Sequence, residues 1–493
     1  MKYVSTRNGI DCVTASQAII RGLAPDGGLY IPESIPRVSP DWIRSLSALD
    51  YKGRAVKVLS LFLDEFSDSE LSDIAAASYA RNFDDPAVAP LRMLDTDTAS
   101  LELWHGPTCA FKDMALQIMP RLLTASLRKN DEERTASILV ATSGDTGKAA
   151  LEGFRDVPGT RIMVFYPRDG VSEVQKLQMA TQEGQNVSVM AVDGNFDDAQ
   201  TGVKKIFGDK MFAEALNGRG FLLSSANSIN WGRLVPQIAY YFSAYCDFAA
   251  AGAIRMGEAM DFCVPTGNFG NILAGWFAKQ MGLPVRRFVC ASNANNVLTD
   301  FIRTGVYDKN RPFTLTTSPS MDILVSSNLE RLLYCLTGDA PRVAGYMKKL
   351  GETGRYDAGA EVREAVQREF AGGFCADADT AACIGRLWRE KRYLADTHTA
   401  VALTVLSDLR GREGKRFPTA VVSTASPFKF CAAVLEALGV RTDKTGPALI
   451  GELSAFTSIA APKPLVNLSR KSVRFNRCVA VRDMELAVDE FLR

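Results

Sequence analysis

The sequence predicts an α/β protein in which helices cover parallel sheets. Short apolar segments alternate with amphipathic helical patterns between residues 137 and 291. Each strand, helix and strand fits within about 30 residues, the usual length of a parallel unit. The composition agrees, because 47% hydrophobic and 23% charged residues in a chain of 493 are typical of a globular protein. We therefore expect strands buried beneath helices, not a disordered or coiled-coil chain.

Apolar runs bounded by turn residues predict the strands, and the amphipathic segments between them predict the helices. The expected strands cover residues 137–141, 161–166, 187–192, 221–225, 261–265 and 286–291. The expected helices cover residues 148–154, 171–183, 196–215, 231–245 and 271–281. A final strand, turn and helix are expected over residues 419–438.

Changes in the pattern divide the chain into four predicted parts. Helical patterns at residues 55–66 and 69–82 precede a stretch at residues 85–90 that contains two prolines and marks a boundary. Residues 311–397 are mostly helical and less regular, which we interpret as an insertion in a second lobe. The predicted parts are an N-terminal domain of residues 1–95, a first α/β lobe of residues 96–245, a second α/β lobe of residues 246–460 and a C-terminal segment of residues 461–493.

The charge balance argues against partners that bind through negative charge. The 57 Lys and Arg residues face 56 Asp and Glu residues, so the net charge of +1 attracts neither nucleic acid nor an anionic membrane. The most apolar window, residues 239–254, is too short to span a bilayer and contains Asp247. The N-terminus lacks an apolar secretory core. We therefore expect a cytoplasmic protein.

Cysteine and histidine usage restricts the chemistry. The ten cysteines contain no C-x-x-C pair, which favours scattered buried thiols over a metal site or a disulfide framework. His105 and His398 are the two histidines of the chain, so we expect no His-rich metal site and no Ser-His-Asp triad. If the protein is an enzyme, a group other than imidazole is expected to move its protons.

Three loops share one pattern, in which an apolar strand is followed by a turn of small and hydroxyl residues and then by a helix. They cover residues 142–147, 266–271 and 423–427. In a parallel sheet such loops emerge at the carboxyl ends of the strands, where ligands bind. Glycines let backbone amides approach an anion, and the following helix adds a favourable dipole. A plain turn is the alternative for any single loop, but three together favour a binding site.

The loops do not match the common nucleotide motifs. A Walker loop requires glycine five positions before Gly147 and a hydroxyl residue after Lys148, whereas the chain has Thr142 and Ala149 there. The G-x-G-x-x-G dinucleotide fingerprint is absent from all three turns. The sequence therefore favours a smaller phosphorylated ligand.

Lys112 follows a Gly-Pro turn and lies at the start of a helix expected over residues 113–123. Lysine is disfavoured at a helix N-terminus because of the helix dipole. Such an environment destabilises the ammonium, so the pKa of Lys112 is expected to fall into the range where the amine forms a Schiff base. On local sequence alone, a solvated surface lysine is the alternative.

Four motifs in order resemble the threonine synthases of the longer class found in enterobacteria and fungi. They cover residues 105–113, 143–147, 267–270 and 423–430. The resemblance begins at Tyr3, includes residues 22–30 and extends to at least Leu438. It departs from the family at Ser426, where the family usually has His, and is weak over residues 311–397 except at residues 320–322.

This resemblance implies a fold-type II pyridoxal-phosphate enzyme with two parallel-sheet lobes, an N-terminal domain and a largely helical insertion. It implies that Lys112 forms the Schiff base with pyridoxal 5'-phosphate. The implied cofactor phosphate loop is Gly267, Asn268, Phe269, Gly270 and Asn271. Asp145 matches the partner of the cofactor's 3′ oxygen, and Thr424 matches the hydroxyl residue facing the pyridine nitrogen. Ser143 and Thr146 match donors to the substrate carboxylate.

Residues 227–233 resemble the family's site for the substrate phosphate, with Asn227, Ser228 and Arg233 as the binding residues. The residue types agree, because an arginine fork matches phosphate oxygens and Asn and Ser supply neutral donors. A surface arginine in an ordinary ion pair is the alternative. Two anion sites fit a phosphorylated amino acid as substrate.

The implied activity is the conversion of O-phospho-L-homoserine and water to L-threonine and phosphate. Lys112 would move protons between the substrate carbons. The alternatives are a phospho-lyase or dehydratase that releases a 2-oxo acid, and a ligand-binding relative without catalysis. A Schiff-base lysine argues against the last of these. The sequence leaves the oligomeric state open.

Overall fold

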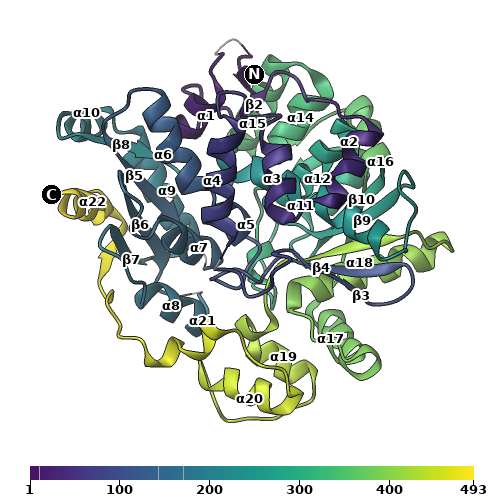
Figure 1. Ribbon diagram of the computed structural model, residues 1–493. Helices are drawn as coiled ribbons and strands as arrows, with labels where there is room; N and C mark the ends of the chain where they lie inside the picture. The colour runs from purple at the N-terminus through teal and green to yellow at the C-terminus, as the bar shows by residue number, and fades with distance from the viewer. Residues whose placement is uncertain (10–11, 81, 143, 170) are drawn as a thin grey trace.

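The computed structural model describes residues 1–9, 12–80, 82–142, 144–169 and 171–493. Two sheets, each with helices packed on it, form the body of the molecule, and the N-terminal and C-terminal segments lie against them (Figure 1). The predicted α/β class with parallel strands is confirmed.

The smaller sheet is parallel throughout, with the strand order β15-β7-β6-β5-β8. Its strands are β5 (Thr135–Ala141), β6 (Thr160–Pro167), β7 (Val187–Asp193), β8 (Phe221–Ser224) and β15 (Cys478–Ala480). The helices between them are α7 (Asp145–Phe154), α8 (Glu173–Ala180), α9 (Phe196–Gly208) and α10 (Lys210–Gly218). Ile138, Leu139 and Val140 of β5 are all buried, as a strand covered on both faces requires.

The single helix predicted over residues 196–215 is wrong, because the chain forms α9 and α10 there. Asp209 has extended backbone between them, and its carboxylate accepts a hydrogen bond of 2.9 Å from the backbone of Phe212. This N-cap begins a new helix.

The larger sheet has the order β13-β10-β9-β14-β4-β3, in which only β3 is antiparallel to its neighbour. Its strands are β3 (Leu91–Met93), β4 (Thr98–Glu102), β9 (Met260–Pro265), β10 (Val285–Ser292), β13 (Phe370–Phe374) and β14 (Thr419–Ser423). The helices α5 (Asp113–Leu116), α6 (Met119–Lys129), α11 (Trp231–Ala250), α12 (Gly270–Met281), α13 (Val297–Thr304) and α18 (Thr397–Glu413) belong to the same body.

Three strands pair with partners that lie far away along the chain. β4 falls within the predicted first lobe at residues 96–245 but pairs with β14 of the larger sheet. β13 comes from the predicted insertion at residues 311–397 and forms an edge of the larger sheet. β15 belongs to the C-terminal segment and pairs with β7. Sequence distance does not reveal such pairings, because each joins strands far apart in the chain.

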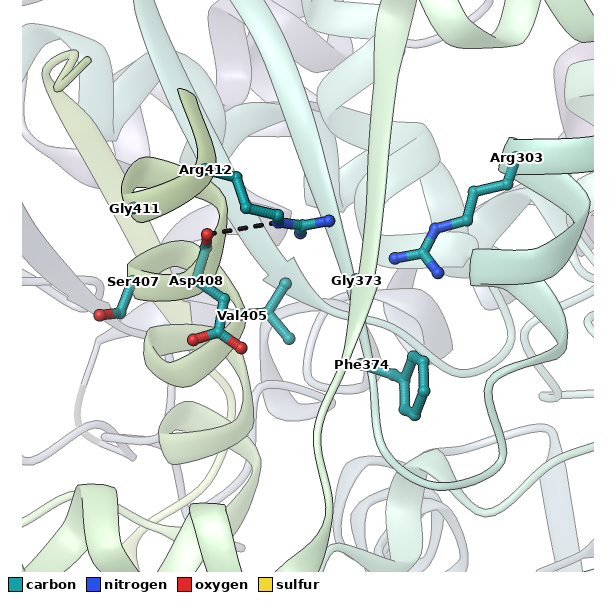
Figure 2. A pocket seen from close by; sticks show the side chains of 8 residues that line it. All are labelled: Arg303, Gly373, Phe374, Val405, Ser407, Asp408, Gly411 and Arg412. Atoms are coloured by element: carbon teal, nitrogen blue, oxygen red, sulfur yellow. Dashed lines mark hydrogen bonds between the residues drawn. The ribbon is translucent and has the colours of Figure 1, made fainter. Parts of the chain in front are cut away.

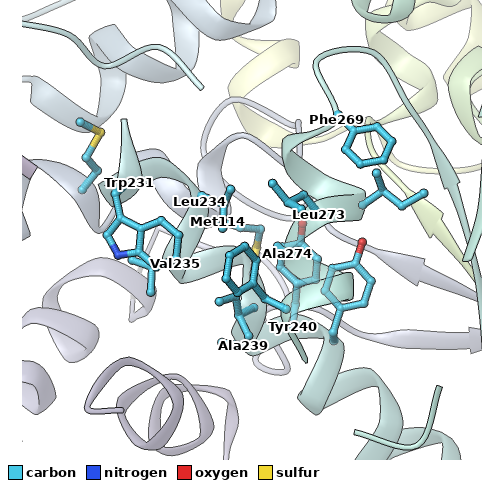
Figure 3. Close-up of a cluster of buried hydrophobic side chains, with 14 of the residues drawn as sticks. Met114, Trp231, Leu234, Val235, Ala239, Tyr240, Phe269, Leu273 and Ala274 are labelled. Carbon is cyan, nitrogen blue, oxygen red and sulfur yellow. The ribbon is translucent and has the colours of Figure 1, made fainter. Parts of the chain in front are cut away.

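The N-terminal part packs onto the larger body through α11, which is buried along most of its length. The N-terminal elements are β1 (Tyr3–Ser5), α1 (Ala15–Arg21), β2 (Tyr30–Pro32), α2 (Pro40–Ser45), α3 (Tyr51–Leu59) and α4 (Asp68–Tyr79). The ring of Trp231 lies 5.4 Å from that of Tyr3 and 5.5 Å from that of Phe277. Figure 3 shows Leu273 and Met114 in the same apolar cluster, which joins α5, α11 and α12.

The remaining helices complete the outside of the molecule. They are α14 (Leu329–Thr337), α15 (Ala340–Thr353), α16 (Ala360–Glu369), α17 (Asp377–Lys391), α19 (Cys431–Ala437), α20 (Ala448–Thr457), α21 (Lys463–Val466) and α22 (Met484–Leu492). A two-stranded ribbon of β11 (Val306–Asp308) and β12 (Arg355–Asp357) joins this part. The C-terminal segment runs back along the molecule to place α22 on α9 (Figure 1). Among the described residues, no helix combines the length and apolarity needed to cross a membrane.

Candidate active site

The three predicted loops follow the carboxyl ends of β5, β9 and β14, and each leads into a helix or a 3-10 turn. The 3-10 turn after the third loop contacts the first loop, since the Lys429 ammonium lies 2.6 Å from the Asp145 carboxylate. The turn that carries Lys112 lies beside the third loop, because the backbone of Phe111 donates a 2.8 Å hydrogen bond to the Thr424 carbonyl. The fold therefore brings these motifs to one place between the two sheets.

Lys112 is the N-cap residue of the short helix α5, and its side chain is 11% exposed. Its Nζ donates a hydrogen bond of 3.3 Å to Ser320 Oγ and lies 3.7 Å from Asp145 Oδ2. Burial, together with the charges of Lys429 and Arg233, lowers the pKa of Lys112 to about 8, although Asp145 acts in the opposite direction. The expected direction of this pKa is confirmed, but its largest cause is burial and not the helix dipole.

A buried aspartate shapes the turn before Lys112. The Asp113 carboxylate accepts hydrogen bonds from the backbone and the hydroxyl of Thr108, at 2.8 and 2.7 Å. Burial raises the pKa of Asp113 to about 6. A Cβ at Gly106 would lie 2.5 Å from Asp113, so only glycine fits where the chain passes this carboxylate. These contacts hold together the turn that precedes Lys112.

Asp145 is the centre of charge of the site. Its carboxylate pairs with the fully buried Lys429 and accepts hydrogen bonds from Gln175 Nε2 at 2.8 Å and Ser320 Oγ at 3.2 Å. Burial would raise the pKa of Asp145, but the ammonium groups of Lys429 and Lys112 hold it well below its usual range. Asp145 is therefore a permanent anion facing the Lys112 amine.

The loop at residues 267–271 has the properties of an anion cradle. Its backbone is fixed by Asn328, whose backbone and side-chain amides both donate to the Asn268 carbonyl at 3.1 Å. Phe269 takes a left-handed conformation at φ +63°, and the N-terminus of α12 behind it has no side-chain cap. Asn271 is buried, and its Nδ2 has no hydrogen-bond partner among the described residues. Free donors at a helix N-terminus fit a phosphate group.

Gly267 and Gly270 differ in how much space surrounds them. A Cβ at Gly267 would lie 3.0 Å from the Ser320 carbonyl oxygen, whereas a Cβ at Gly270 would meet the Asn328 amide at 3.4 Å. A side chain is therefore least tolerated at Gly267.

Thr424 is buried next to the Lys112 turn, and Ala425 forms an isolated antiparallel bridge with Ala110. Ser426, where the family usually has His, has a local role in this chain. Its hydroxyl accepts from the backbone of Phe428 at 3.4 Å and caps the 3-10 turn that carries Lys429.

Arg233 lies in the first turn of α11 and is 4% exposed. One Nη donates a 2.5 Å hydrogen bond to the Ala226 carbonyl, and its Nε has no partner in the part of the chain that the structure describes. Burial lowers the pKa of Arg233 to about 10. Asn227 and Ser228 are half-buried in the loop just before this helix. A buried guanidinium with an unused N–H fits an anionic ligand.

Thr146 lies half-buried in the first turn of α7, on the same loop as Asp145. Ser143 lies outside the described residues, so its predicted contact with a carboxylate stays a prediction. The other predicted residues lie in the segments described above.

His105 lies between the carboxylates of Asp84 and Glu102. Burial works against a charged His105 ring, but hydrogen bonds to Asp84 at 2.6 Å and Glu102 at 3.1 Å raise its pKa to about 9. This ring stacks on Trp104 at 4.2 Å, and the indole of Trp104 donates to Ser423 Oγ at 3.1 Å. His105 therefore supports, through Trp104, the start of the third loop at Ser423.

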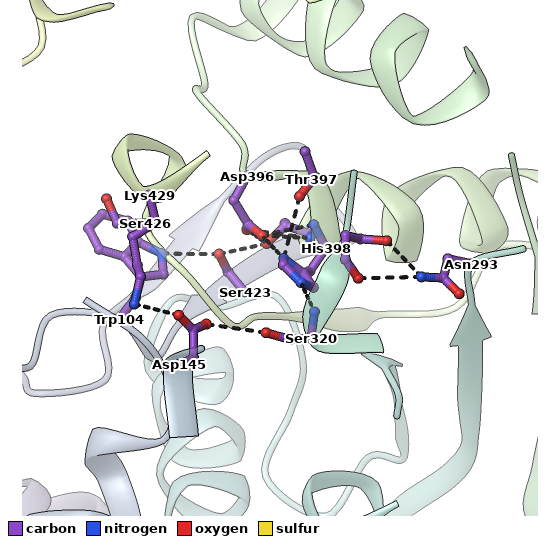
Figure 4. A network of polar contacts seen from close by, with 12 residues as sticks. Trp104, Asp145, Asn293, Ser320, Asp396, Thr397, His398, Ser423, Ser426 and Lys429 are labelled. Atoms are coloured by element: carbon purple, nitrogen blue, oxygen red, sulfur yellow. Dashed lines mark hydrogen bonds and ion pairs between the residues drawn. The ribbon is translucent and has the colours of Figure 1, made fainter. Parts of the chain in front are cut away.

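From the sequence, no site role is predicted for His398, Ser320 or Lys429, and neither Asp396 nor Gln175 is singled out. Figure 4 shows most of this polar network around Asp145 and Ser320. His398 Nε2 accepts from the backbone N–H of Ser320 at 3.2 Å. Ser320 and Lys429 lie within motifs that resemble the family, and that resemblance could have identified them as site residues. His398 and Asp396 lie in no such motif.

A separate pocket of about 450 Å³ lies beside the outer part of α18 (Figure 2). Arg303 and Arg412 approach it from opposite sides, and Phe374 of the edge strand lines it. None of its lining residues belongs to the group around Lys112, so it is distinct from the candidate site. Within the described ranges, no group of three His, Cys, Asp or Glu side chains could hold a metal ion.

Three family profiles match the chain in sequence order. The profile described as "Threonine synthase N terminus" matches residues 2–79, "Pyridoxal-phosphate dependent enzyme" matches residues 100–425, and "Threonine synthase, C-terminal" matches residues 399–480. The middle profile covers Lys112, all three loops as far as Ala425, and the Arg233 segment.

Individual relatives agree with the profiles. Human threonine synthase-like 1 is 37% identical over 96% of this chain, which spans 64% of that relative's length. The threonine synthase of Pseudomonas aeruginosa is 38% identical, over 92% of this chain and 93% of its own. A crystal structure of PLP-bound threonine synthase from Brucella melitensis aligns over 100% of both chains with a TM-score of 0.87 and 37% identity. The chain therefore belongs to the threonine synthase family of pyridoxal-phosphate-dependent enzymes.

Proposed function

We propose that this protein converts O-phospho-L-homoserine and water to L-threonine and phosphate, with pyridoxal 5'-phosphate as cofactor. The observation that carries the proposal is the pair of unused buried donors, Asn271 Nδ2 and Arg233 Nε, in the two segments expected to hold phosphate. One donor set suits the phosphate of the cofactor and the other that of the substrate. The names of the relatives support the same activity.

The residues around Lys112 fit the cofactor. The Lys112 amine would hold it covalently as a Schiff base, the loop of residues 267–271 would bind its phosphate, and Thr424 would face its ring nitrogen. Asp145 would lie beside its 3′ oxygen. When bound, this cofactor withdraws electrons from the carbon atoms next to the amino group of the substrate. A hydroxyl such as that of Thr424 does not strongly hold the ring protonated, so the withdrawal would be moderate.

Lys112 would transfer the protons of the reaction. An amine accepts a proton only when it is neutral, and a pKa of about 8 leaves a useful neutral fraction near physiological pH. The amine is held between Ser320 and Asp145, which places one group at the reacting carbons for successive proton transfers.

Arg233, Asn227 and Ser228 would bind the substrate phosphate. The guanidinium is buried, so its interaction with a phosphate that gains charge on leaving is stronger than it would be in water. Thr146 and Ser143 would orient the substrate carboxylate. With its phosphate and its carboxylate both bound, the substrate would have its central carbons near the Lys112 amine.

The proposed location is the cytoplasm. All ten cysteines are free thiols, and most of them are buried, which fits a reducing compartment. The proposed partner is the small phosphorylated substrate.

The test is product analysis with purified protein, added pyridoxal phosphate and O-phospho-L-homoserine. We expect phosphate and L-threonine in equal amounts. Release of 2-oxobutanoate and ammonia with phosphate would show the lyase alternative, which the names of the relatives do not favour. A lack of phosphate release with fully loaded protein would contradict the proposal.

A further inference from the structure

Ser320 occupies a special position between the two charged groups of the site. It lies in a 3-10 turn (Pro319–Met321) that follows the ribbon strand β11 in sequence. Its Oγ donates its single hydrogen to Asp145 Oδ2 at 3.2 Å and therefore offers only lone pairs to Lys112. Lys112 Nζ donates to that oxygen at 3.3 Å. The hydroxyl orientation thus follows from its two neighbours.

This arrangement directs the Lys112 amine. A neutral amine that donates one N–H to Ser320 Oγ and turns the other toward Asp145 Oδ2, 3.7 Å away, leaves one remaining direction for its lone pair. Proton transfer from carbon requires that lone pair to be aligned with the substrate. A fixed Ser320 would supply such alignment.

The backbone of Ser320 is held by a buried histidine. Its N–H donates to His398 Nε2 at 3.2 Å, and a backbone N–H can only donate, so Nε2 carries no proton. The ring hydrogen is then on Nδ1, which donates to Asp396 Oδ1 at 2.9 Å. His398 is 1% exposed and Asp396 is fully buried, so water cannot replace either contact easily. Figure 4 shows this chain from Asp396 to Ser320.

A second attachment holds the same turn from its other side. The Asp322 carboxylate accepts from Asn293 Nδ2 at 2.7 Å and from Thr316 Oγ1 at 2.7 Å. Asn293 directly follows β10, so the turn is anchored to the larger sheet. Ser320 is therefore fixed by rigid elements on both sides, as a group that must orient another residue requires.

The contact from His398 is not explained by helix capping. Asp396 is the N-cap of α18 and accepts hydrogen bonds from the backbone of His398 and Thr399 without any help from the imidazole. The Nδ1 side of the imidazole contacts Asp396 and, at 3.5 Å, Thr397 Oγ1. Its Nε2 side accepts from the backbone of Ser320, and the ring makes an edge contact with Phe430, at 4.9 Å between centroids. The Nε2 hydrogen bond therefore links the N-terminus of α18 to the Ser320 turn.

We propose that Ser320, held by the Asp396–His398 pair, is a positioning residue that aims the Lys112 amine. This inference rests on the proposed function, in which that amine transfers the protons. It assigns a role to three residues outside the predicted site. It also explains why the buried hydrogen bonds from Asp396 through His398 lead to Ser320, the hydrogen-bond partner of Lys112.

The experiment compares four variants with the wild type, each as the cofactor-loaded protein. Ser320→Ala removes the hydroxyl, and His398→Leu removes the acceptor for its backbone. His398→Gln restores an acceptor of similar reach. Thr317→Val is the matched control, because it loses a 3.0 Å hydrogen bond to Asp377 in the same segment without touching Lys112 or His398. The readouts are kcat and KM for O-phospho-L-homoserine, the pH midpoint of the bound cofactor's absorbance change, and Tm.

We expect Ser320→Ala to lower kcat about tenfold or more, to leave KM within about twofold and to shift the absorbance midpoint. His398→Leu should act in the same direction, and His398→Gln should recover most of the loss. Thr317→Val should match the wild type in kcat and midpoint. If His398→Leu does not fold, Ser320→Ala decides the question alone.

An unchanged kcat and midpoint in Ser320→Ala would overturn the inference. It would also be overturned if His398→Leu and His398→Gln lowered Tm equally and left kcat and the midpoint unchanged. If the wild type makes no threonine, the proposed function fails instead. The absorbance midpoint still tests the aim of Lys112 in that case, because it requires only bound cofactor.

Discussion

Two lysines lie near the Asp145 carboxylate, and they differ in their distance from it and in their other hydrogen-bond partner. Lys429 is fully buried, lies 2.6 Å from Asp145 and also donates to the Thr108 carbonyl at 3.0 Å. Lys112 lies 3.7 Å from the same carboxylate, donates to a neutral hydroxyl and has a lowered pKa. The close pair largely balances the charge of Asp145, so the second amine can lose its proton. Both lysines are largely buried, and they differ in their distance from Asp145 and in their second partner.

Substitution of Lys112 should have the largest effect of all. Lys112→Ala removes both the covalent anchor and the proton-transfer group, so we expect the loss of nearly all turnover and of the bound cofactor's visible absorbance. Exposed Lys57→Ala should change neither and serves as the control. A variant that keeps even a tenth of wild-type kcat would contradict the role of Lys112.

Lys429→Met should lower the stability of the fold and also change the pH dependence of activity. It leaves the buried Asp145 without its closest cation, which should lower the free energy of unfolding by about 3 kcal/mol. It also removes a positive charge that lowers the pKa of Lys112, so that pKa should rise. Because activity requires the neutral amine, the acidic side of the pH profile of kcat/KM should move to higher pH.

Denaturant unfolding and pH–rate profiles measure both effects of Lys429→Met. Lys429→Arg keeps the charge and should shift the profile less. A profile that stays in place, or that moves to lower pH, would mean that Lys429 does not influence the Lys112 amine.

Arg233 extends the comparison to a third buried cation, which has no carboxylate partner in the described ranges. Arg233→Ala should lower kcat/KM for O-phospho-L-homoserine about a hundredfold, or on the order of 3 kcal/mol, because a charge-assisted contact to the leaving group is lost. Arg233→Lys should rescue only part, since a point charge does not replace the planar fork.

The spectral Kd for L-threonine separates the phosphate contact from general damage at Arg233. Threonine has no phosphate, so its binding should change much less than turnover. Equal losses in both measurements would show that Arg233 only supports the structure.

The smallest expected effect compares two glycines of one loop. Gly267→Val should weaken cofactor affinity about tenfold or more, because its side chain would press on the backbone at Ser320. Gly270→Val should weaken it less, since its nearest neighbour is a side-chain amide. Cofactor titration by absorbance gives both affinities, and the reverse order would contradict this account of the loop.

The sequence alone determined the elements and the chemistry that each local segment can carry. The alternation of apolar runs predicted β5 to β10 and most of the helices between them, because burial on both faces leaves a pattern that can be read within a few residues. The turn before Lys112 and the glycine loop at residues 267–271 were also recognisable from residues close in the chain. The predictions of the α/β class and of the family were confirmed on this basis.

Only the tertiary structure decided which distant segments meet. The strands β4, β13 and β15 have ordinary local patterns, and their sheets became known only from pairing with partners far along the chain. The same holds for Lys429 at Asp145 and for His398 at Ser320, which are 284 and 78 positions apart. A hydrogen bond or an ion pair leaves no periodic trace in either segment, because its energy depends on the distance between atoms that only the packed sheets bring together.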